Sequence, residues 1–399
     1  MRGISSNGQD QVRVFRTRPE VEELREFWSS AHKGPHADLD FFRFIIDLYP
    51  EAIRPHVIAV YRDNSPRILL IGRLEEKSLN FRIGYMQFRT NIVRILTFVH
   101  GCVAGSLTDH DATCLVRSIR SSLQGGEAEV ACFESLDVNG PIFLRSLETL
   151  GFLTGSLLNR SSHYSRSLDA DKTFLESLSS NARNHHKRCG RKLSNVHQGR
   201  IRIECFREPS TINRLMQDTE IVARKSYQRK LGVGFHHTSQ TYKRLDFEAR
   251  RGWLRGYLLY IEDRPSAYWI GYLYRGTFYS GYMAYDPAHA KMAPGRYLTI
   301  EVLKELSAGE AHERASSVDF GSGEAEYKTR FSNHSWTEAT LFLFAPRLRC
   351  QMLRGLWMVA LAMSFVGKKI LNLTNVAPHF RRYWRSRIAA VSAIRSLSV

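Results

Sequence analysis

Four side chains that can move protons or carry charge lie close together near the end of the second half of the chain: Asp319, Glu324, Tyr327 and Lys328. Their surroundings, residues 318–331, combine a short apolar strand, a turn punctuated by glycine and the start of a helix. On a helix, residues three or four positions apart lie on one side. The spacing therefore predicts that Glu324 lies on the same helix side as Tyr327, one turn before Lys328.

These residue types suit the transfer of an acyl group from a thioester to a nucleophile. That reaction needs a base for the acceptor, a group that stabilises the oxyanion and a proton donor for the departing thiolate. Glu324 could be the base, directly or through water, and Tyr327 the acid, since a phenol with a pKa of about 10 can protonate a thiolate. Asp319, at the strand end, could orient the acceptor. A capped helix with a surface Glu–Lys pair and a packing tyrosine fits the same pattern, and both interpretations stay open.

A second segment upstream has the properties of an anion-binding turn. An aromatic strand at 278–286 leads into a loop at 289–296 and then into a helix-like run. The first turn of a helix offers backbone N–H groups and the positive end of the helix dipole to a phosphate. Gly295 would let the backbone approach the ligand closely, and Arg296 would add a positive charge. The segment predicts a pyrophosphate site, although an ordinary turn before a helix has the same pattern.

The order of these parts resembles the acyl-CoA half of the GNAT acyltransferase superfamily. Residues 319–328, DFGSGEAEYK, are similar to the "DFG-x-G-[DE]-x-x-YK" string of the CelD-like, or cellulose-biosynthesis, acetyltransferases. The resemblance implies catalytic roles for Asp319, Glu324, Tyr327 and Lys328, and an acyl-CoA co-substrate without a metal. It also implies a cofactor-binding segment that comprises Met283, Ala284, Tyr285, Ala293, Gly295, Arg296 and Tyr297. One glycine in this loop departs from the richer Q/R-x-x-G-x-G/A pattern of many GNAT enzymes.

The function that this resemblance implies is transfer of an acyl group, expected to be acetyl, from acyl-CoA to an amine or hydroxyl. A sugar or cell-envelope precursor in polysaccharide biosynthesis is the implied acceptor. The related FemAB peptidyltransferases use aminoacyl-tRNA, and the helix expected at 181–200 resembles a basic tRNA-contacting element, but no separate coiled-coil arm is visible. Nucleic acid is a partner only in that alternative. The third possibility is a non-catalytic protein that binds an anionic polymer or lipid.

The elements that would position these residues alternate between helix and strand. Apolar residues at helical spacing, such as Phe41, Ile45 and Leu48, predict helices, and shorter apolar runs predict strands. The helices expected are 19–31, 38–48, 108–124, 140–150, 173–193, 210–227, 238–251, 296–308 and 324–332. The strands expected are 56–61, 67–74, 81–88, 94–99, 128–133, 162–168, 200–206, 253–262, 265–275, 277–285, 315–320 and 337–344.

A short internal repeat favours duplication of one α/β unit. Tyr61-x4-Pro66-x4-Ile-Gly and Tyr260-x4-Pro265-x4-Ile-Gly are the same string, each spanning a strand, a polar turn and a strand. The expected fold class is α/β, with two tandem GNAT-like domains, each a twisted mixed sheet flanked by helices, and a basic C-terminal helical tail. The expected limits are 1–168, 169–345 and 346–399.

The first half of the chain lacks both signatures. Residues 131–140 offer a strand and a turn but no Tyr-Lys helix, and no loop before the helix at 108 combines glycine with arginine. We therefore interpret this half as a degenerate copy that shapes the acceptor cleft. His100 beside Cys102, at a strand end, is interpreted as structural.

The charge distribution and the cysteine spacing limit the kinds of ligand that we expect this chain to bind. The six cysteines form no Cys-x-x-Cys pair, so neither a zinc site nor a redox motif is indicated. Of the formal net charge of +18, residues 346–399 carry +10, from ten Arg and Lys and no Asp or Glu, and a second basic patch lies at 183–192. Such patches favour polyanions, including anionic lipid or the phosphates of a cofactor, or they are solvated basic faces.

The sequence leads us to expect a cytoplasmic protein. Residues 1–11 lack the apolar core of a secretory signal, and the longest apolar run, 356–366, is shorter than the roughly 20 residues of a spanning helix. Aromatic and basic residues in 346–399 suit an anionic surface. Peripheral association with the inner face of the membrane through this tail is therefore a further expectation.

Overall fold

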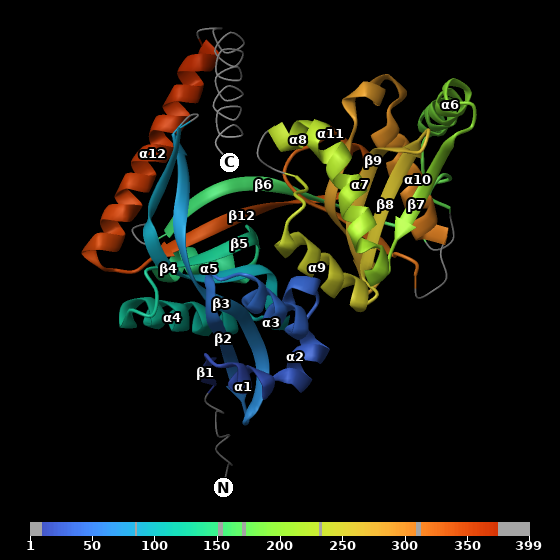
Figure 1. Ribbon diagram of the computed structural model, residues 1–399. Coiled ribbons are helices and arrows are strands. Elements are labelled where there is room, and N and C mark those ends of the chain that lie inside the picture. The colour runs from blue at the N-terminus through green and yellow to red at the C-terminus, as the bar shows by residue number, and fades with distance from the viewer. Residues whose placement is uncertain are drawn as a thin grey trace. The chain divides into compact units, whose positions relative to one another are not determined.

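The computed structural model describes residues 10–83, 86–150, 155–169, 173–230, 234–308 and 313–373 (Figure 1). Contacts within the chain divide it into two compact units. Unit 1 comprises residues 1–160 and 337–399, and unit 2 comprises residues 161–336.

Unit 1 is built on an extended, mostly antiparallel sheet. Its strand order is β1-β2-β3-β4-β5-β12, in which only β4 and β5 run parallel. The elements are β1 (Gln11–Phe15), α1 (Arg18–Glu22), α2 (Arg25–Ala31), η1 (Pro35–Ala37), α3 (Leu39–Leu48), β2 (Ala52–Arg62), β3 (Ser65–Ile83), β4 (Met86–Gly105), α4 (Asp109–Gly125), β5 (Val130–Asp137), α5 (Pro141–Leu150), β12 (His334–Phe344) and α12 (Leu348–Leu373).

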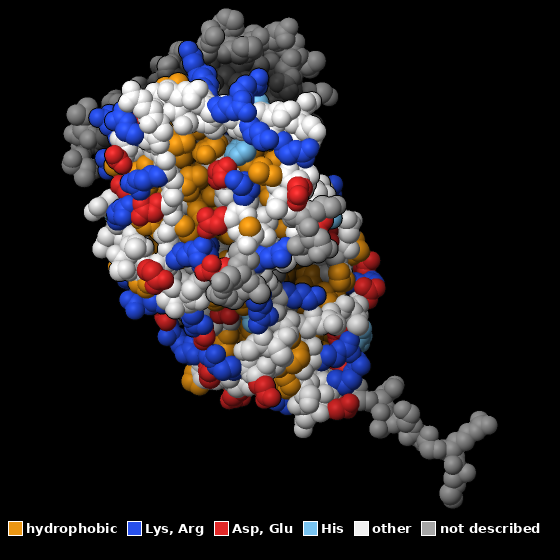
Figure 2. Space-filling view, turned by 90° about the vertical axis from the view of Figure 1, so that its right-hand side faces the viewer, with side chains coloured by type: hydrophobic (Ala, Val, Ile, Leu, Met, Phe, Trp, Pro, Cys, Tyr) orange, Lys and Arg blue, Asp and Glu red, His pale blue; other side chains and the backbone are white. Residues whose placement is uncertain are grey.

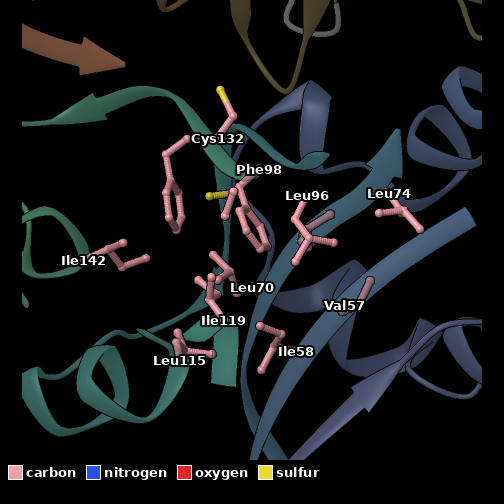
Figure 3. Close-up of a cluster of buried hydrophobic side chains, with 14 of the residues drawn as sticks. Val57, Ile58, Leu70, Leu74, Leu96, Phe98, Leu115, Ile119, Cys132 and Ile142 are labelled. Atoms are coloured by element: carbon pink, nitrogen blue, oxygen red, sulfur yellow. The ribbon is translucent and has the colours of Figure 1, made fainter. Parts of the chain in front are cut away.

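Helix starts and apolar faces explain how these helices form and where they pack. Asp38 caps α3 by accepting hydrogen bonds from two backbone N–H groups. Thr108 caps α4 in a capping box, in which its side chain accepts from the Asp111 N–H and the Asp111 carboxylate accepts from the Thr108 N–H. α3 and α4 both contact β2. Figure 3 shows the core that results, with Leu115 and Ile119 of α4 close to Leu70 of β3. Each such side chain contributes about 1.5–3 kcal/mol through burial.

Unit 2 repeats the plan with helices on both faces of its sheet. The strand order is β6-β11-β10-β9-β8-β7, and only β10 and β11 run parallel. The elements are β6 (Gly155–Ser167), α6 (Ser180–Val196), β7 (Ile201–Phe206), η2 (Pro209–Thr211), α7 (Ile212–Lys225), α8 (Tyr227–Lys230), α9 (Ser239–Arg250), β8 (Leu254–Ile261), β9 (Arg264–Tyr274), β10 (Thr277–Tyr285), η3 (Pro287–Met292), α10 (Pro294–Ala308), β11 (Ser317–Ser322) and α11 (Glu326–Phe331).

Two separate apolar clusters show that α7 and α10 of unit 2 cover opposite faces of the sheet. Leu298 and Leu303 of α10 pack with Trp269 and other residues of the sheet, whereas Leu215 of α7 packs with Ile270, the next residue along β9. Successive strand residues point to opposite faces. The helices therefore sandwich the sheet (Figure 1).

The internal repeat corresponds to the same hairpin in both units. The β2–β3 turn has Asp63 and Asn64 at φ 51° and 61°, and the β8–β9 turn has Glu262 and Asp263 at φ 50° and 61°. Two consecutive positive φ values define the type I′ turn that matches the twist of a hairpin.

The glycine that closes each copy of the repeat lies against a phenylalanine ring. A Cβ on Gly72 would lie 2.5 Å from Phe98, and one on Gly271 would lie 2.5 Å from Phe278. These shared contacts support the tandem duplication predicted from the sequence, and the mixed α/β fold is confirmed.

The compact units are not consecutive segments of the chain. β6 follows the last helix of the first half but pairs with β11, and β12 follows α11 but pairs with β5. Residues 161–168 therefore belong to unit 2, and 337–345 to unit 1. The domain limits 1–168, 169–345 and 346–399 stay a prediction. Residues 374–399 of the expected tail lie outside the described residues.

Several local expectations were wrong. No separate strand lies at 81–88: residues 81–83 end β3 and residues 86–88 begin β4, while residues 84–85 lie outside the described residues. The strand β1 was not expected from the sequence. The helix expected from 173 begins at Ser180, with Ser179 as its cap, and the one expected from 324 begins at Glu326. No helix in the described parts of the chain is both long and apolar enough to cross a membrane.

A buried histidine in unit 1 makes its stability depend on pH. His56 is fully buried, 3.4 Å from Glu127, and burial lowers its pKa to about 4 although Glu127 opposes the shift. The unfolded chain, with a histidine pKa of about 6.5, binds more protons in this window, so stability is lost as the pH falls. From about pH 7 to about pH 5 we expect His56 alone to cost about 2 kcal/mol of unfolding free energy.

Urea denaturation at both pH values, for the wild type and His56→Gln, measures this effect. The variant should lose the histidine contribution to the pH dependence, whereas the exposed-site control His110→Gln should keep it. Parallel pH dependences for wild type and His56→Gln would contradict the assignment.

Candidate functional site

The strand fork, formed by residues 277–285 of β10 and 317–322 of β11, is the central feature of unit 2. The two strands pair in parallel from Thr277 with Ser317 to Tyr279 with Asp319. Immediately afterwards both strands shift register, and β10 stays with β9 while β11 stays with β6. Among the described residues beyond Asp319 and Tyr279, the two strands form no further ladder. The edge of β10 can therefore pair with an extended ligand that carries amide groups.

Asp319 lies where the strand fork opens and joins several groups there. Its Oδ1 is 2.6 Å from Nε2 of His163 and also accepts a hydrogen bond from the Gly321 N–H at 2.7 Å. His163 is 4% exposed and stacks on the Trp336 ring at 4.3 Å. Because a carboxylate can only accept, Nε2 of His163 carries the proton that lies between them. The arrangement is a carboxylate that fixes the orientation of an imidazole, as in general-base sites.

The pKa values of the groups near Asp319 follow from burial and from its charge. Burial, with a contribution from the Asp319 carboxylate, raises the pKa of Tyr279 to about 12. Burial also lowers the pKa of Lys328, and the carboxylate partly offsets this shift. Tyr279 stacks on Tyr272 at 5.3 Å. Tyr279 therefore keeps its proton at neutral pH.

Lys328 and Tyr327, on α11, were both predicted as site residues. Lys328 is 9% exposed, and its ammonium donates to the carbonyls of Ser322 at 2.7 Å and Gly321 at 3.2 Å. Tyr327 lies edge-on to Phe320, with ring centroids 6.3 Å apart, and burial raises its pKa to about 12. Its hydroxyl is a proton donor that stays protonated at neutral pH. The structure thus brings Asp319 and Lys328 together at the strand fork, whereas the Tyr327 ring packs with Phe320 against the apolar cluster beneath α10.

Glu324 does not lie where the spacing predicted. Ala325 is extended and precedes the first turn of α11, so Glu324 is outside the helix, and its side chain is exposed. The expected helix side shared with Tyr327 is wrong, because Gly321 and Gly323, both with positive φ, prolong the turn. The surface ion pair of α11 joins Glu326 and Arg330 instead.

The predicted pyrophosphate turn lies between η3 and α10. Ala293 has φ 52°, a left-handed conformation that ends η3 one residue before α10 begins at Pro294. A Cβ on Gly295 would approach the Tyr285 ring to 3.0 Å, so a larger residue would have to displace that exposed ring. Ala284 is buried under α7, and Met283 packs partly on the core beneath α10.

A cationic cluster, formed by Arg188, Arg296 and Arg330 with the imidazole of His185 beside them, lies near the first turn of α10. Burial, and then the nearby Arg330, lower the pKa of Arg296. Desolvation and these arginines likewise lower the pKa of His185. Among the described residues, Nε of Arg296 is buried without a hydrogen-bond partner. A bound anion would reduce the repulsion between Arg296 and Arg330, and it would accept a hydrogen bond from Nε of Arg296.

The side of α6 next to this cluster is hollowed. A concavity of about 580 Å³ is lined by Asn181, Asn184, His185, Lys187, Arg188 and Arg191. Figure 2 shows Lys and Arg side chains gathered at the top of its face, the height at which α6 lies in Figure 1. Tyr297, the last of the predicted cofactor residues, stacks on His186 of α6 at 5.3 Å.

Sequence reasoning missed His163, Arg330 and the contribution of α6 to this site. His163 is 156 residues from Asp319, and nothing in the string Ser-His-Tyr-Ser marks it. The basic patch of α6 was visible, but its position beside α10 was not. In the described part of the chain, no group of three or more His, Cys, Asp or Glu side chains could hold a metal ion.

In unit 1 the parallel strands β4 and β5 also separate after a short ladder, but different side chains lie beyond it. β4 and β5 pair from Ile95 with Val130 to Phe98 with Phe133. Beyond this ladder, His100 lies 3.6 Å from the buried Glu338 of β12. Burial raises the pKa of the Cys102 thiol to about 12, which makes the thiolate a rare form at neutral pH.

Comparison with known proteins agrees with this geometry. Residues 180–329 match the family model described as an acetyltransferase (GNAT) domain. The match runs from α6 to α11 and includes every predicted catalytic and cofactor residue. This part of the chain therefore has a GNAT acyltransferase-type fold. No curated protein matches the sequence significantly.

Solved structures are also similar to this chain, at low sequence identity. FemX matches with a TM-score of 0.54 at 10% identity, over 83% of this chain and 97% of that one. A tandem GNAT protein from the clavulanic acid biosynthesis pathway matches with a TM-score of 0.48 at 9% identity, over 84% and 99%. The likeness to FemX shows a shared fold.

Lys328 should stabilise the strand fork even without a ligand. Lys328→Met keeps the length and burial of the side chain but leaves two carbonyls at the end of β11 without their donor. We expect a loss of about 1–3 kcal/mol of unfolding free energy, measured by urea denaturation. The exposed-site control Lys243→Met, on α9, should change it by less than about 0.5 kcal/mol. Equal stability of the two variants would contradict this role.

Proposed function

We propose that the chain is an acyltransferase that moves an acyl group, acetyl in the first instance, from acyl-CoA to an amine or hydroxyl. The observation that carries the proposal is the strand fork, with Asp319, His163 and Lys328 where it opens and the cationic cluster at the start of α10. The GNAT family match over residues 180–329 supports the same reaction class.

The chain has suitable groups for each part of an acyl-CoA. The pyrophosphate would bind the backbone N–H groups at the start of α10, where Gly295 adds no side chain and Arg296 offers its unpaired Nε. The amide-bearing arm would pair with the free edge of β10 beyond Tyr279. The thioester would then lie toward the opening of the strand fork, next to the titratable groups.

The proposed proton transfers use neighbouring side chains. Because Nε2 of His163 donates to Asp319, the proton of the acceptor nucleophile would go to Nδ1, which is buried and would have to become accessible when the acceptor binds. The carboxylate would then stabilise the imidazolium that forms. Tyr327 would donate its phenolic proton to the thiolate of CoA as the carbon–sulfur bond breaks. Glu324, exposed in the turn, stays a proposed base acting through water.

We also propose a particular family and a class of acceptor. The string at 319–328 supports a CelD-like acetyltransferase whose acceptor is a sugar or cell-envelope precursor in polysaccharide biosynthesis. The cytoplasm, with contact at the inner face of the membrane, would be the matching location. Unit 1, which keeps the fold but not the cofactor turn, would contribute to acceptor recognition.

A second candidate function is transfer from aminoacyl-tRNA, as in the FemAB enzymes. The observation that favours it is the basic side of α6, with Lys187, Arg188 and Arg191 around one concavity. RNA backbones are bound by such clusters in a salt-dependent manner. A non-catalytic polyanion-binding protein would use the same surface.

The first test is binding of acyl-CoA. Isothermal titration calorimetry with acetyl-CoA and longer acyl-CoAs should show binding, and Arg296→Ala should weaken it by about 1.5–3 kcal/mol because a charge-assisted hydrogen bond is lost. The matched control is Arg250→Ala, an exposed arginine on α9, which should bind normally. Absence of heat with every acyl-CoA, together with tight binding of charged tRNA, would favour the second candidate instead.

A second test separates chemistry from binding. Tyr327→Phe removes only the phenolic hydroxyl, so turnover should fall about 100-fold while the Kd for acetyl-CoA stays near its normal value. The readout is release of free CoA thiol from acetyl-CoA in the presence of a panel of sugars, amino sugars and amines. Tyr49→Phe, in unit 1, is the control. Normal turnover in the Tyr327 variant would show that another group donates the proton.

A further inference from the structure

Among the described side chains of α12, those that pack on the rest of unit 1 lie on one side of the helix. Cys350, Leu353 and Trp357 are wholly or largely buried, and the Trp357 ring lies 4.7 Å from that of Phe342 and 6.0 Å from that of Phe344 on β12. Figure 1 shows the helix alongside the long strands β3 and β4. An amphipathic surface helix would place polar residues on its other side.

The other side of α12 is instead apolar and exposed. We call it the apolar stripe, which consists of Leu348, Met352, Leu356, Val359 and Met363, exposed by 80%, 62%, 63%, 57% and 55%. Spacings of three and four residues place all five on one line along the helix. Five large apolar residues in an unbroken line form a contiguous patch, which on a folded protein marks an interaction surface.

The apolar surface continues from the helix onto the sheet. A groove of about 470 Å³ runs between α12 and β4, lined by Leu348, Met352 and Leu356 on one side and by Thr90, Asn91 and Val93 on the other. Ile92, between the last two, is 65% exposed. The patch is therefore wider than a single helix face.

Positive charge accompanies the apolar stripe. Arg347 and Arg349 are exposed at the start of the helix, on either side of Leu348, and Arg349 lies 3.7 Å from Glu129, an acidic residue that also lines the groove. The segment 346–399 has ten basic residues and no acidic one. An occupant of the apolar stripe must therefore tolerate or neutralise a strongly cationic neighbourhood.

We propose that the apolar stripe of α12 docks the protein on the surface of an anionic phospholipid bilayer, with the helix lying in the plane of the interface. Acyl chains would receive the five apolar side chains, and the phosphate groups would neutralise the flanking arginines. A second copy of the chain would instead bring two segments of +10 together.

Vesicle co-sedimentation of the full chain tests the proposal. Wild type should pellet with phosphatidylcholine vesicles that contain phosphatidylglycerol, and far less with phosphatidylcholine alone, and high salt should weaken the binding. The triple exchange Leu348→Gln, Met352→Gln and Leu356→Gln should lower the apparent affinity at least about tenfold, since three apolar insertions are lost. Because these side chains are exposed, the variant should keep the wild-type melting temperature.

The matched control is the double exchange Leu144→Gln and Ile221→Gln, two exposed apolar residues on α5 and α7, which should pellet like wild type. Equal pelleting of the triple variant and wild type would overturn the proposal. So would binding to neutral vesicles that matches binding to anionic ones. A dimer seen by light scattering that the triple exchange dissolves, without any vesicle binding, would assign the apolar stripe to a second copy and equally overturn it.

Discussion

The separation of two parallel strands after a three-residue ladder is the constraint on which the chemistry of unit 2 depends. Once β11 leaves β10, backbone groups near the opening need other partners. β6 supplies some of them, Asp319 accepts from the Gly321 N–H, and the Lys328 ammonium donates to the next carbonyls. The polar side chains of the site are thus the groups that satisfy the backbone where β11 leaves β10.

Burial and charge act against each other in this site. Desolvation disfavours the charged form of Lys328, whereas the Asp319 carboxylate favours it. The same carboxylate orients His163, whose ring stacks on that of Trp336. At the start of α10 the balance is different, since Arg296 and Arg330 repel each other near a helix terminus that already favours anions. The two ends of the candidate site thus differ in charge, with a partly buried carboxylate at one end and repelling arginines at the other.

The two units share an arrangement of strands and helices but differ in the side chains that this arrangement brings together. Both contain a hairpin with a type I′ turn, a glycine against a phenylalanine ring and a parallel strand reached through a helix. In unit 1 that plan supports a continuous apolar core and an apolar stripe on α12. In unit 2 it supports the strand fork and the cationic cluster. The exchange of β6 and β12 means that neither unit is complete within its own half of the sequence.

The sequence by itself determined the fold class, most of the helices and strands, and the string at 319–328, because periodicity, turn residues and local motifs are short-range properties. It also made the repeat visible through Pro66 and Pro265. Only the tertiary structure decided that His163 meets Asp319, that α6 lies beside α10, and that Glu324 precedes α11. Those outcomes depend on strand pairing across more than a hundred residues and on the left-handed conformations of two glycines. The apolar stripe of α12 shows the same limit, since spacing marks a face as apolar but only packing decides whether it is covered.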